Sequence, residues 1–456
     1  MPLRFLIIYY QIANDTKILI LKLFVESMLK KLIVMFLIIS LLVLAYLIYT
    51  NPYIFPLDIL NPLREVRDYL QQTKASTERT FGIPLNAKFF DSNFQIQEYV
   101  TGLSSPTSMA FINNDMFVLE KNTGNIILVR DGQIMKSLYT FDVSSNNESG
   151  LLGITSYQNN IYVYVTEFDK NLQKSIGNNI YSFFWNGDIL QNRQLLNSLS
   201  SESSWHNGGA ITHDLDGNIF AVIGDQIGVG RDDLKNDFRI LQNVENGEID
   251  DSGVIVKIGK DKVVQPKFSE NPLEHYRAIG IRNSFGLAVD PYTNNLWDTE
   301  NGPENFDEIN LISENFNSGW SVAMGPATKE QISKIPSLGK FEYSDPEFSW
   351  EKTVSPTGLT FVNSDKFSSY DGDLIVASCN YGILFKFSLN DQRNGFNVKS
   401  EHLKDLVVND TDFEVMDEIK LGEGFGCMTD VDFGPDGNLY ITSFTDNTIY
   451  RILPNN

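Results

Sequence analysis

Hydrophobic and polar residues alternate in short runs along most of the chain, and turns rich in Asn, Asp and Gly separate these runs. The pattern recurs six times, for example in MAFINNDMFVLEKNTGNIILV (109–129), AITHDLDGNIFAVIGDQ (210–226) and VDFGPDGNLYITSFTDNTIYRI (431–452). Alternation with a period of two predicts strands, and turn dipeptides between the runs predict hairpins. Helical periodicity nearly vanishes after residue 94. We therefore expect an all-β protein.

The spacing of the repeats predicts a six-bladed β-propeller over residues 95–456. The copies lie roughly 45–75 residues apart, a period typical of propellers and other repeat arrays. About 60 residues per copy suffice for four strands and their loops. We also expect the segment near Phe94–Val100, or the last residues of the chain, to close the ring by adding a strand to a terminal blade.

The apolar run Leu32–Tyr49 differs from the rest of the chain. It holds about 18 uncharged residues, just long enough to span a bilayer. Lys30 and Lys31 precede it, and the positive-inside rule then places residues 1–31 in the cytoplasm. The sequence thus predicts a transmembrane helix at 32–49, a linker at 50–94 and an extracytoplasmic propeller, in a single-pass protein of the cell membrane. A cleaved signal peptide is the alternative interpretation.

Composition narrows the class of protein further. The chain has 456 residues, of which 42% are hydrophobic and 21% charged, as in a globular protein. A formal charge of −22 argues against a nucleic-acid partner, which needs a basic face. The two cysteines exclude a zinc cluster and permit one disulfide. No GxGxxG or Walker motif occurs, which removes the Rossmann class.

His206 is one of only four histidines, and it stands at the start of a predicted hairpin that Asp225 closes. Arg282 opens the next repeat. A histidine that is oriented by a carboxylate and faces an arginine can abstract a proton from an alcohol, and the arginine can stabilise the developing oxyanion. Three structural interpretations stay open: a loop histidine, an aspartate that caps a turn, and an arginine that joins two blades.

The stretch ENGPENFDEIN (300–310) is an acidic loop with glycine and proline. Its oxygen donors, in an irregular loop, suit Ca²⁺. The alternative is a solvated acidic loop in an acidic protein. The carboxylates in question are Glu300, Glu304, Asp307 and Glu308.

These stretches, in this order, resemble the glucose/sorbosone dehydrogenase family, whose members use pyrroloquinoline quinone (PQQ) and Ca²⁺. The resemblance runs from about Leu103 to Ile452 and implies a six-bladed propeller that oxidises a small sugar or alcohol. Each motif is weak alone, and the ordered set is specific. The set comprises GLLG (150–153), HNGG (206–209), GIRN (280–283), ENGP (300–303), DEIN (307–310), SPTG (355–358) and GPDGNLY (434–440).

The resemblance implies roles for single residues. His206 matches the general base that takes the proton of the anomeric hydroxyl, and Asp225 matches the carboxylate that pairs with it. Arg282 and Asn283 match the pair that contacts the quinone oxygens. Glu148 stands where the family contacts substrate or cofactor.

The same resemblance places the metal and the rim of the pocket. The carbonyl groups of Gly302 and Pro303, with Glu308, match the calcium-binding loop. Trp350 and Thr353 match the rim of the cofactor pocket.

Three positions depart from the family pattern. Where the family has a lysine and two arginines that hold the carboxylates of PQQ, this chain has Asn380, Cys427 and Thr429. A thiol or a hydroxyl cannot replace a bidentate arginine–carboxylate contact. Two functions therefore stay open: a PQQ-type sugar dehydrogenase with a remodelled site, and a propeller without PQQ that serves as a calcium-stabilised binding module or a lactonase-type hydrolase.

The resemblance also brings Cys379 and Cys427 to the side of the pocket where those cations would lie. We expect a disulfide between them if their Cα atoms are about 4.4–6.8 Å apart. Two unpaired small residues in neighbouring blades are the alternative.

Overall fold

The computed structural model describes residues 87–226, 251–259, 272–336, 338–409 and 413–455, together with the short strand pair β13 (Val244–Glu245) and β14 (Glu248–Ile249). The predicted transmembrane helix at 32–49, the cytoplasmic segment 1–31 and most of the linker lie outside the described residues. Within the described part of the chain, no helix combines the length and the apolar character needed to cross a bilayer.

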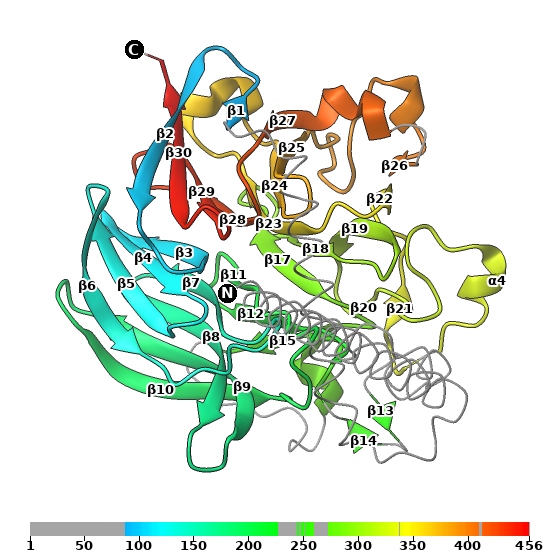
Figure 1. Ribbon diagram of the computed structural model, residues 1–456. Coiled ribbons are helices and arrows are strands. Elements are labelled where there is room, and N and C mark those ends of the chain that lie inside the picture. Colours follow the sequence, from blue (N-terminus) through cyan, green and yellow to red (C-terminus); the bar gives the residue numbers. More distant parts are fainter. Residues whose placement is uncertain are drawn as a thin grey trace, which may run out of the picture. The chain divides into compact units, whose positions relative to one another are not determined.

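In the described residues, six sheets of four to six strands follow one another along the chain (Figure 1). The first contains β3 (Pro106–Ile112), β4 (Asp115–Glu120), β5 (Asn125–Arg130) and β6 (Gln133–Thr140). The second contains β7 (Leu151–Tyr157), β8 (Asn160–Asp169), β9 (Lys174–Trp185) and β10 (Leu190–Leu199). The third contains β11 (Ile211–His213), β12 (Ile219–Ile223), β15 (Val254–Ile258), β16 (Tyr276–Ile279), β20 (Phe316–Asn317) and β21 (Glu342–Tyr343).

The remaining three sheets combine distant parts of the chain. The fourth contains β17 (Ser284–Val289), β18 (Leu296–Glu300), β19 (Asn305–Ile312), β22 (Phe348–Lys352) and β26 (Val407–Val408). The fifth contains β23 (Pro356–Phe361), β24 (Leu374–Ser378), β25 (Ile383–Phe387), β27 (Lys420–Glu423) and β1 (Lys88–Phe89). The sixth contains β28 (Met428–Phe433), β29 (Leu439–Ser443), β30 (Thr448–Pro454) and β2 (Phe94–Thr101).

Helical structure is sparse in the described residues. One short helix, α4 (Lys329–Ile332), begins with a capping box in which Thr328 and Gln331 satisfy each other's backbone N–H groups. The 3₁₀ segments have three to seven residues each: Pro272–His275, Asp365–Tyr370, Glu401–Leu403 and Phe413–Ile419. All of them lie in connections between strands.

The innermost strands of the six sheets are β3, β7, β11, β17, β23 and β28. Each contacts the next in chain order, and β28 contacts β3, so the six strands form a closed ring. The other strands of each sheet extend outward from this ring (Figure 1). Sheets arranged around a central channel define a propeller. The predicted all-β propeller arrangement is confirmed.

The ring closes with strands from both ends of the propeller. Strand β2 is the outer strand of the sixth sheet and pairs antiparallel with β30, with Phe94 opposite Pro454. The prediction that the segment near Phe94–Val100 closes the ring is therefore confirmed.

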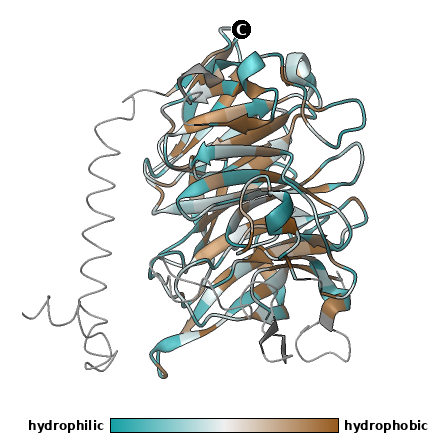
Figure 2. Ribbon diagram, turned by 90° about the vertical axis from the view of Figure 1, so that its right-hand side faces the viewer, coloured by the Kyte–Doolittle hydropathy of each residue, from teal (hydrophilic) through white to brown (hydrophobic). Residues whose placement is uncertain are grey.

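Each hydrophobic cluster joins two neighbouring sheets. Trp297 of the fourth sheet and Phe385 of the fifth belong to one cluster, for example, and Val118 of the first sheet packs with Tyr440 of the sixth in another. Apolar stretches, in brown, lie on the stacked strands between hydrophilic ones (Figure 2). The alternation read from the sequence thus buries one set of side chains between sheets, as the pleat of a strand requires.

The Asp-Gly turns are structural, as their sequence predicts. In the turn between β11 and β12, Asp214 accepts hydrogen bonds from the backbone N–H groups of Asp216 and Asn218. Gly217 has a φ of 82°, a conformation in which a side chain would be strained and would meet the ring of Tyr157.

Candidate active site

The central channel contains a cavity of about 650 Å³. Residues from the innermost strands of all six sheets line it. We call one end the Glu148 end. There the cavity is lined by Asn147 and Glu148 just before β7, by Cys427 just before β28, and by Lys121 just after β4. We call the other half the Asp432 end, where His213 and Asp432 line it. A propeller channel of this size is the expected place for a ligand.

His206 and Asp225 form a buried pair beside the Glu148 end. The His206 Nδ1 and Asp225 Oδ1 atoms are 2.6 Å apart, and the two residues are 4% and 3% exposed. The second oxygen of Asp225 accepts a hydrogen bond of 2.6 Å from the indole N–H of Trp320. An ionised Asp225 would hold the proton on Nδ1 and leave the Nε2 lone pair available as a base.

Glu148 connects this pair with the start of the fourth sheet. Its Oε2 accepts a hydrogen bond of 2.6 Å from the backbone N–H of His206 and one of 3.2 Å from the side-chain amide of Asn283. His206 has a φ of 53°, in the left-handed region, and the Glu148 contact helps to hold its backbone there. The structure therefore brings together His206, Asp225, Asn283 and Glu148.

Arg282 is buried next to the same group. Its Nη1 donates to the carbonyl oxygens of Asn301 and Gly302 at 2.6 and 3.0 Å, and its guanidinium lies 5.3 Å from the centre of the Trp320 ring. Its buried Nε has no hydrogen-bond partner among the described residues. Burial lowers the pKa of Arg282, and surrounding carboxylates, Asp225 foremost, oppose that shift. Arg282 is thus a cation held within a mostly acidic environment.

Trp350 lies elsewhere, in the hydrophobic core rather than at a pocket rim. It is 0% exposed and packs against Phe348, Phe385 and Phe387. The pleat of β22 turns its side chain between the fourth and fifth sheets. Thr353 follows β22 and is half-buried, and it is not among the described residues that line the cavity.

The predicted calcium loop does not converge on one point. The Gly302 carbonyl already accepts from Arg282, and Pro303 is exposed. Glu308 is buried on β19, where its carboxylate accepts from the backbone N–H of Gly325 and from the amide of Asn310. Within the described ranges, no group of three or more His, Cys, Asp and Glu side chains is placed to hold a metal ion.

Cys379 and Cys427 form a disulfide, which confirms the predicted pairing. Their Cα atoms are 3.8 Å apart, closer than the expected 4.4–6.8 Å. Cys427 lines the Glu148 end, as does Thr429, whose hydroxyl donates to the carbonyl of Pro106. Asn380 follows the disulfide in the chain, and its buried side-chain oxygen has no partner among the described residues. A covalent link between the fifth and sixth sheets thus lies where the resemblance expects cations.

Sequence reasoning missed two residues of this site. Lys121 lines the Glu148 end, and its Nζ donates to the carbonyl of Asn147 at 2.8 Å. Burial lowers its pKa to about 8, against the opposing charge of Glu148. Of the described residues that line the cavity, Lys121 alone carries a Lys or Arg side chain. The second residue that sequence reasoning missed is Trp320, because nothing in its sequence neighbourhood links it to Asp225.

Buried carboxylates predict how stability depends on pH. Burial raises the pKa of Asp307 and Asp430 to about 6; burial and then the charge of Asp430 raise that of Asp432 to about 7. Unfolding returns each to about 4. Their contribution to stability is therefore present below pH 4 and is lost as the pH rises through 6 to 7. We expect the free energy of unfolding, measured with urea at pH 5, 6.5 and 8, to fall with rising pH, and less steeply in Asp432→Asn. An equally steep fall in the variant contradicts this.

Comparisons with known proteins find relatives in sequence and in fold. The sequence model of the family described as "Glucose / Sorbosone dehydrogenase" matches residues 103–451. An uncharacterized protein of Synechocystis, slr1608, is 25% identical over 76% of this chain and 83% of its own length. The aldose sugar dehydrogenase YliI of Escherichia coli is 27% identical over 55% of this chain and 61% of YliI.

A solved structure shares the fold. The PQQ-bound form of the aldose sugar dehydrogenase from Streptomyces coelicolor superimposes with a TM-score of 0.56 at 19% identity, over 81% of this chain and 99% of that one. The family match covers well over half of the sequence. The chain belongs to the glucose/sorbosone dehydrogenase family.

Proposed function

We propose that this protein oxidises a hydroxyl group of a sugar or a related alcohol, with His206 as the base. The observation that carries the proposal is the buried His206–Asp225 hydrogen bond of 2.6 Å beside the channel cavity. The relatives named as aldose sugar dehydrogenases supply the substrate class. We further propose a six-bladed propeller that faces outward from the cell membrane on the anchor predicted at 32–49.

The chemistry assigned to the chain's own residues is a proton transfer. His206 Nε2 takes the proton of the substrate hydroxyl, and Asp225 stabilises the imidazolium that forms. Arg282 contacts Trp320, which donates a hydrogen bond to Asp225. Asn283 donates a hydrogen bond to Glu148, which accepts another from the His206 backbone. We assign both Arg282 and Asn283 to stabilising the developing oxyanion. The carbon that becomes a carbonyl then releases a hydride, and a two-electron acceptor must receive it.

The residues present do not fit PQQ, the acceptor that the family resemblance implies. A tricarboxylate needs cations, and the three expected positions hold Asn380, Cys427 and Thr429, with Cys427 committed to a disulfide. The one cavity-lining ammonium described, on Lys121, faces Glu148. The carboxylates around Arg282 would repel three more negative charges. We therefore propose an uncharged quinone as the acceptor.

An activity assay of the full-length chain tests the proposal. We expect aldoses to be oxidised with a neutral substituted benzoquinone, and we expect added PQQ and Ca²⁺ not to increase the rate. If no member of a panel of aldoses and alcohols is oxidised, the proposed dehydrogenase activity is rejected. Tight PQQ binding, measured by titration of absorbance, would reject the uncharged acceptor alone.

The disulfide favours a second candidate, a propeller that binds a ligand or hydrolyses a lactone without a cofactor. It links two sheets where a cofactor clamp would otherwise lie. Hydrolysis of sugar lactones without oxidation of any aldose, in the same assay series, would support this function instead.

Calcium is expected to have no effect on stability. Because Arg282 occupies the Gly302 carbonyl and Glu308 is satisfied by Gly325 and Asn310, the loop offers no assembled site. The melting temperature of the full-length chain should change by less than about 1 °C between excess EDTA and excess Ca²⁺, because only a ligand that binds the folded state shifts it. A melting temperature that rises with Ca²⁺ in wild type but not in Glu308→Ala would show that this loop binds calcium.

A further inference from the structure

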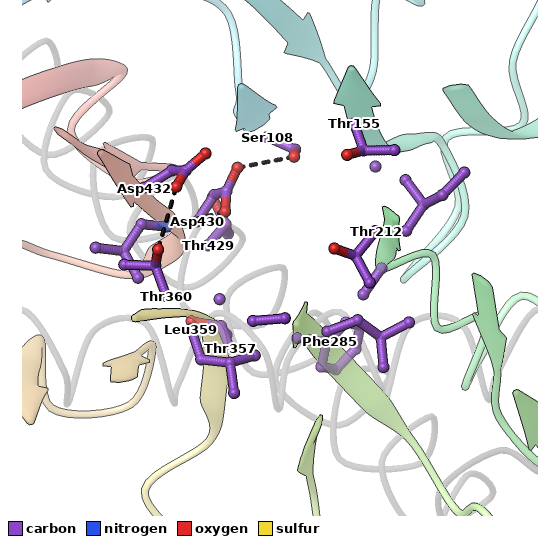
Figure 3. A pocket seen from close by; sticks show the side chains of 18 of the residues that line it. Ser108, Thr155, Thr212, Phe285, Thr357, Leu359, Thr360, Thr429, Asp430 and Asp432 are labelled. Carbon is purple, nitrogen blue, oxygen red and sulfur yellow. Dashed lines mark hydrogen bonds between the residues drawn. The ribbon is translucent and has the colours of Figure 1, made fainter. Parts of the chain in front are cut away.

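The Asp432 end of the channel carries a polar group of its own. Asp430 and Asp432 of β28 line one side, and Thr155, Thr212 and His213 of the second and third sheets line the cavity as well. Figure 3 shows the threonine hydroxyls and the two carboxylates around the same space. The mechanism proposed for His206 uses none of these residues.

The two carboxylates differ in how they are satisfied. Asp430 Oδ2 accepts from the Ser108 hydroxyl and the Met109 N–H, both at 2.8 Å, and Oδ1 accepts from the Val431 N–H. Asp430 therefore has a structural role: its hydrogen bonds join the sixth sheet to the first.

Asp432 can accept further hydrogen bonds. Its Oδ1 accepts from the Thr360 hydroxyl at 3.1 Å and the Phe433 N–H at 2.8 Å, and among the described residues no donor is found for Oδ2. The side chain is held from one side and lines the cavity with the other (Figure 3). A carboxylate fixed in this way is ready to accept a hydrogen bond from a ligand.

His213 supplies a neutral partner in the same space. Its Nδ1 lies 3.0 Å from the Thr155 hydroxyl, and burial lowers the pKa of the ring, so the imidazole is uncharged near neutral pH. A neutral imidazole and a threonine hydroxyl can each donate or accept. His213 and Asp432 also line a smaller adjoining cavity of about 300 Å³, so the two face a shared opening.

Charge and surface chemistry decide the ligand class. No Lys or Arg lines this half among the described residues, and no three acidic or metal-binding side chains are placed for a metal ion. Val289 and Phe433, at the ends of β17 and β28, add apolar surface next to the hydroxyls. Hydroxyls that donate and accept, one free carboxylate oxygen and apolar surface are a combination that recognises the O–H groups and C–H faces of a polyol.

We propose that the Asp432 end is a second binding site, separate from the His206 site, for a neutral polyol such as a sugar or an alditol. Asp432 accepts from two hydroxyl groups of the ligand, Thr155, Thr212 and His213 form hydrogen bonds with the others, and Val289 and Phe433 pack against the carbon skeleton. The site goes beyond the proposed oxidation, since it requires no transfer of protons or electrons.

Calorimetric titration of the full-length chain with 1,5-anhydroglucitol tests the site. This probe is a neutral polyol, and the titration contains no quinone acceptor, so the probe is bound without being oxidised. The titration is run at pH 8, above the pKa of about 7 of Asp432, so that this carboxylate is ionised. We expect Asp432→Asn to raise the Kd of the probe by about tenfold or more, because a hydrogen bond to a charged acceptor is lost. Thr360→Val, which removes the hydroxyl that holds Asp432, should weaken binding in the same direction.

Two control variants distinguish binding at the Asp432 end from binding at the His206 site and from a general effect on the protein. Ser137→Ala, on the exposed outer strand β6, and His206→Gln, at the other end of the channel, should each change Kd by less than about twofold. Loss of binding in His206→Gln with retention in Asp432→Asn would overturn the proposal. It would also be overturned if Asp432→Asn abolished binding of Tb³⁺ or of glucosamine, a cationic amino sugar, and left binding of the neutral probe unchanged.

Discussion

Replacing His206 with glutamine is expected to lower kcat/KM for aldose oxidation by about 1,000-fold, as removal of a general base typically does. Glutamine keeps a donor for Asp225 but has no lone pair that can accept a proton at neutral pH. The measurement is the initial rate with the neutral benzoquinone acceptor, for wild type and variant at equal folded concentration. Asp225→Asn should cause a smaller loss, because it disturbs the tautomer and orientation of His206 without removing the base.

His402→Gln is the matched control, since it changes an exposed histidine of the segment Glu401–Leu403, which is not among the described residues that line the cavity. Its rate should stay within about threefold of wild type. Equal losses in the two histidine variants would indicate a general effect on the propeller and would contradict the assignment of the base. An unchanged melting temperature in both variants shows that folding is not the cause.

Replacing both cysteines with serine is expected to lower the free energy of unfolding by roughly 4 kcal/mol. The disulfide joins positions that are 48 residues apart, and the cross-link limits the freedom of that loop in the unfolded chain. Urea unfolding under non-reducing conditions measures the difference. Dithiothreitol should lower the stability of wild type toward that of the variant and leave the variant unchanged. A double variant as stable as wild type would assign the disulfide no stabilising role.

The repeat pattern was sufficient to predict the arrangement of the sheets. Alternating residues and Asp-Gly turns are local signals, and each repeat here corresponds to a local group of hairpins. The pairing of His206 with Asp225 was also accessible, because they flank a single hairpin made by β11 and β12. Likewise, the closing strand could be placed, since a ring needs a partner for its last sheet.

Contacts between distant segments were not accessible in the same way. Trp320 reaches Asp225 from 95 positions away, through the connection that follows β20. Trp350 was expected at a rim, but which face of β22 points into the core depends on a register that the run SWEKT leaves open. The predicted calcium loop also depends on contacts between distant segments. Its carbonyl oxygens were visible in the sequence, and the arginine that takes one of them was assigned to another role.

The pairing of β2 with β30 has a consequence for how the protein is made. Phe94 and Pro454 lie about 360 positions apart, so β2 leaves the ribosome long before its partner exists. At about 5–20 residues per second, the delay is roughly 20–70 s. Throughout that interval β2 offers an unpaired edge that a second nascent chain could occupy. Synthesis that stops before β30 would leave the last sheet open at the same edge, so a nearly complete chain should be far more prone to aggregation than a complete one.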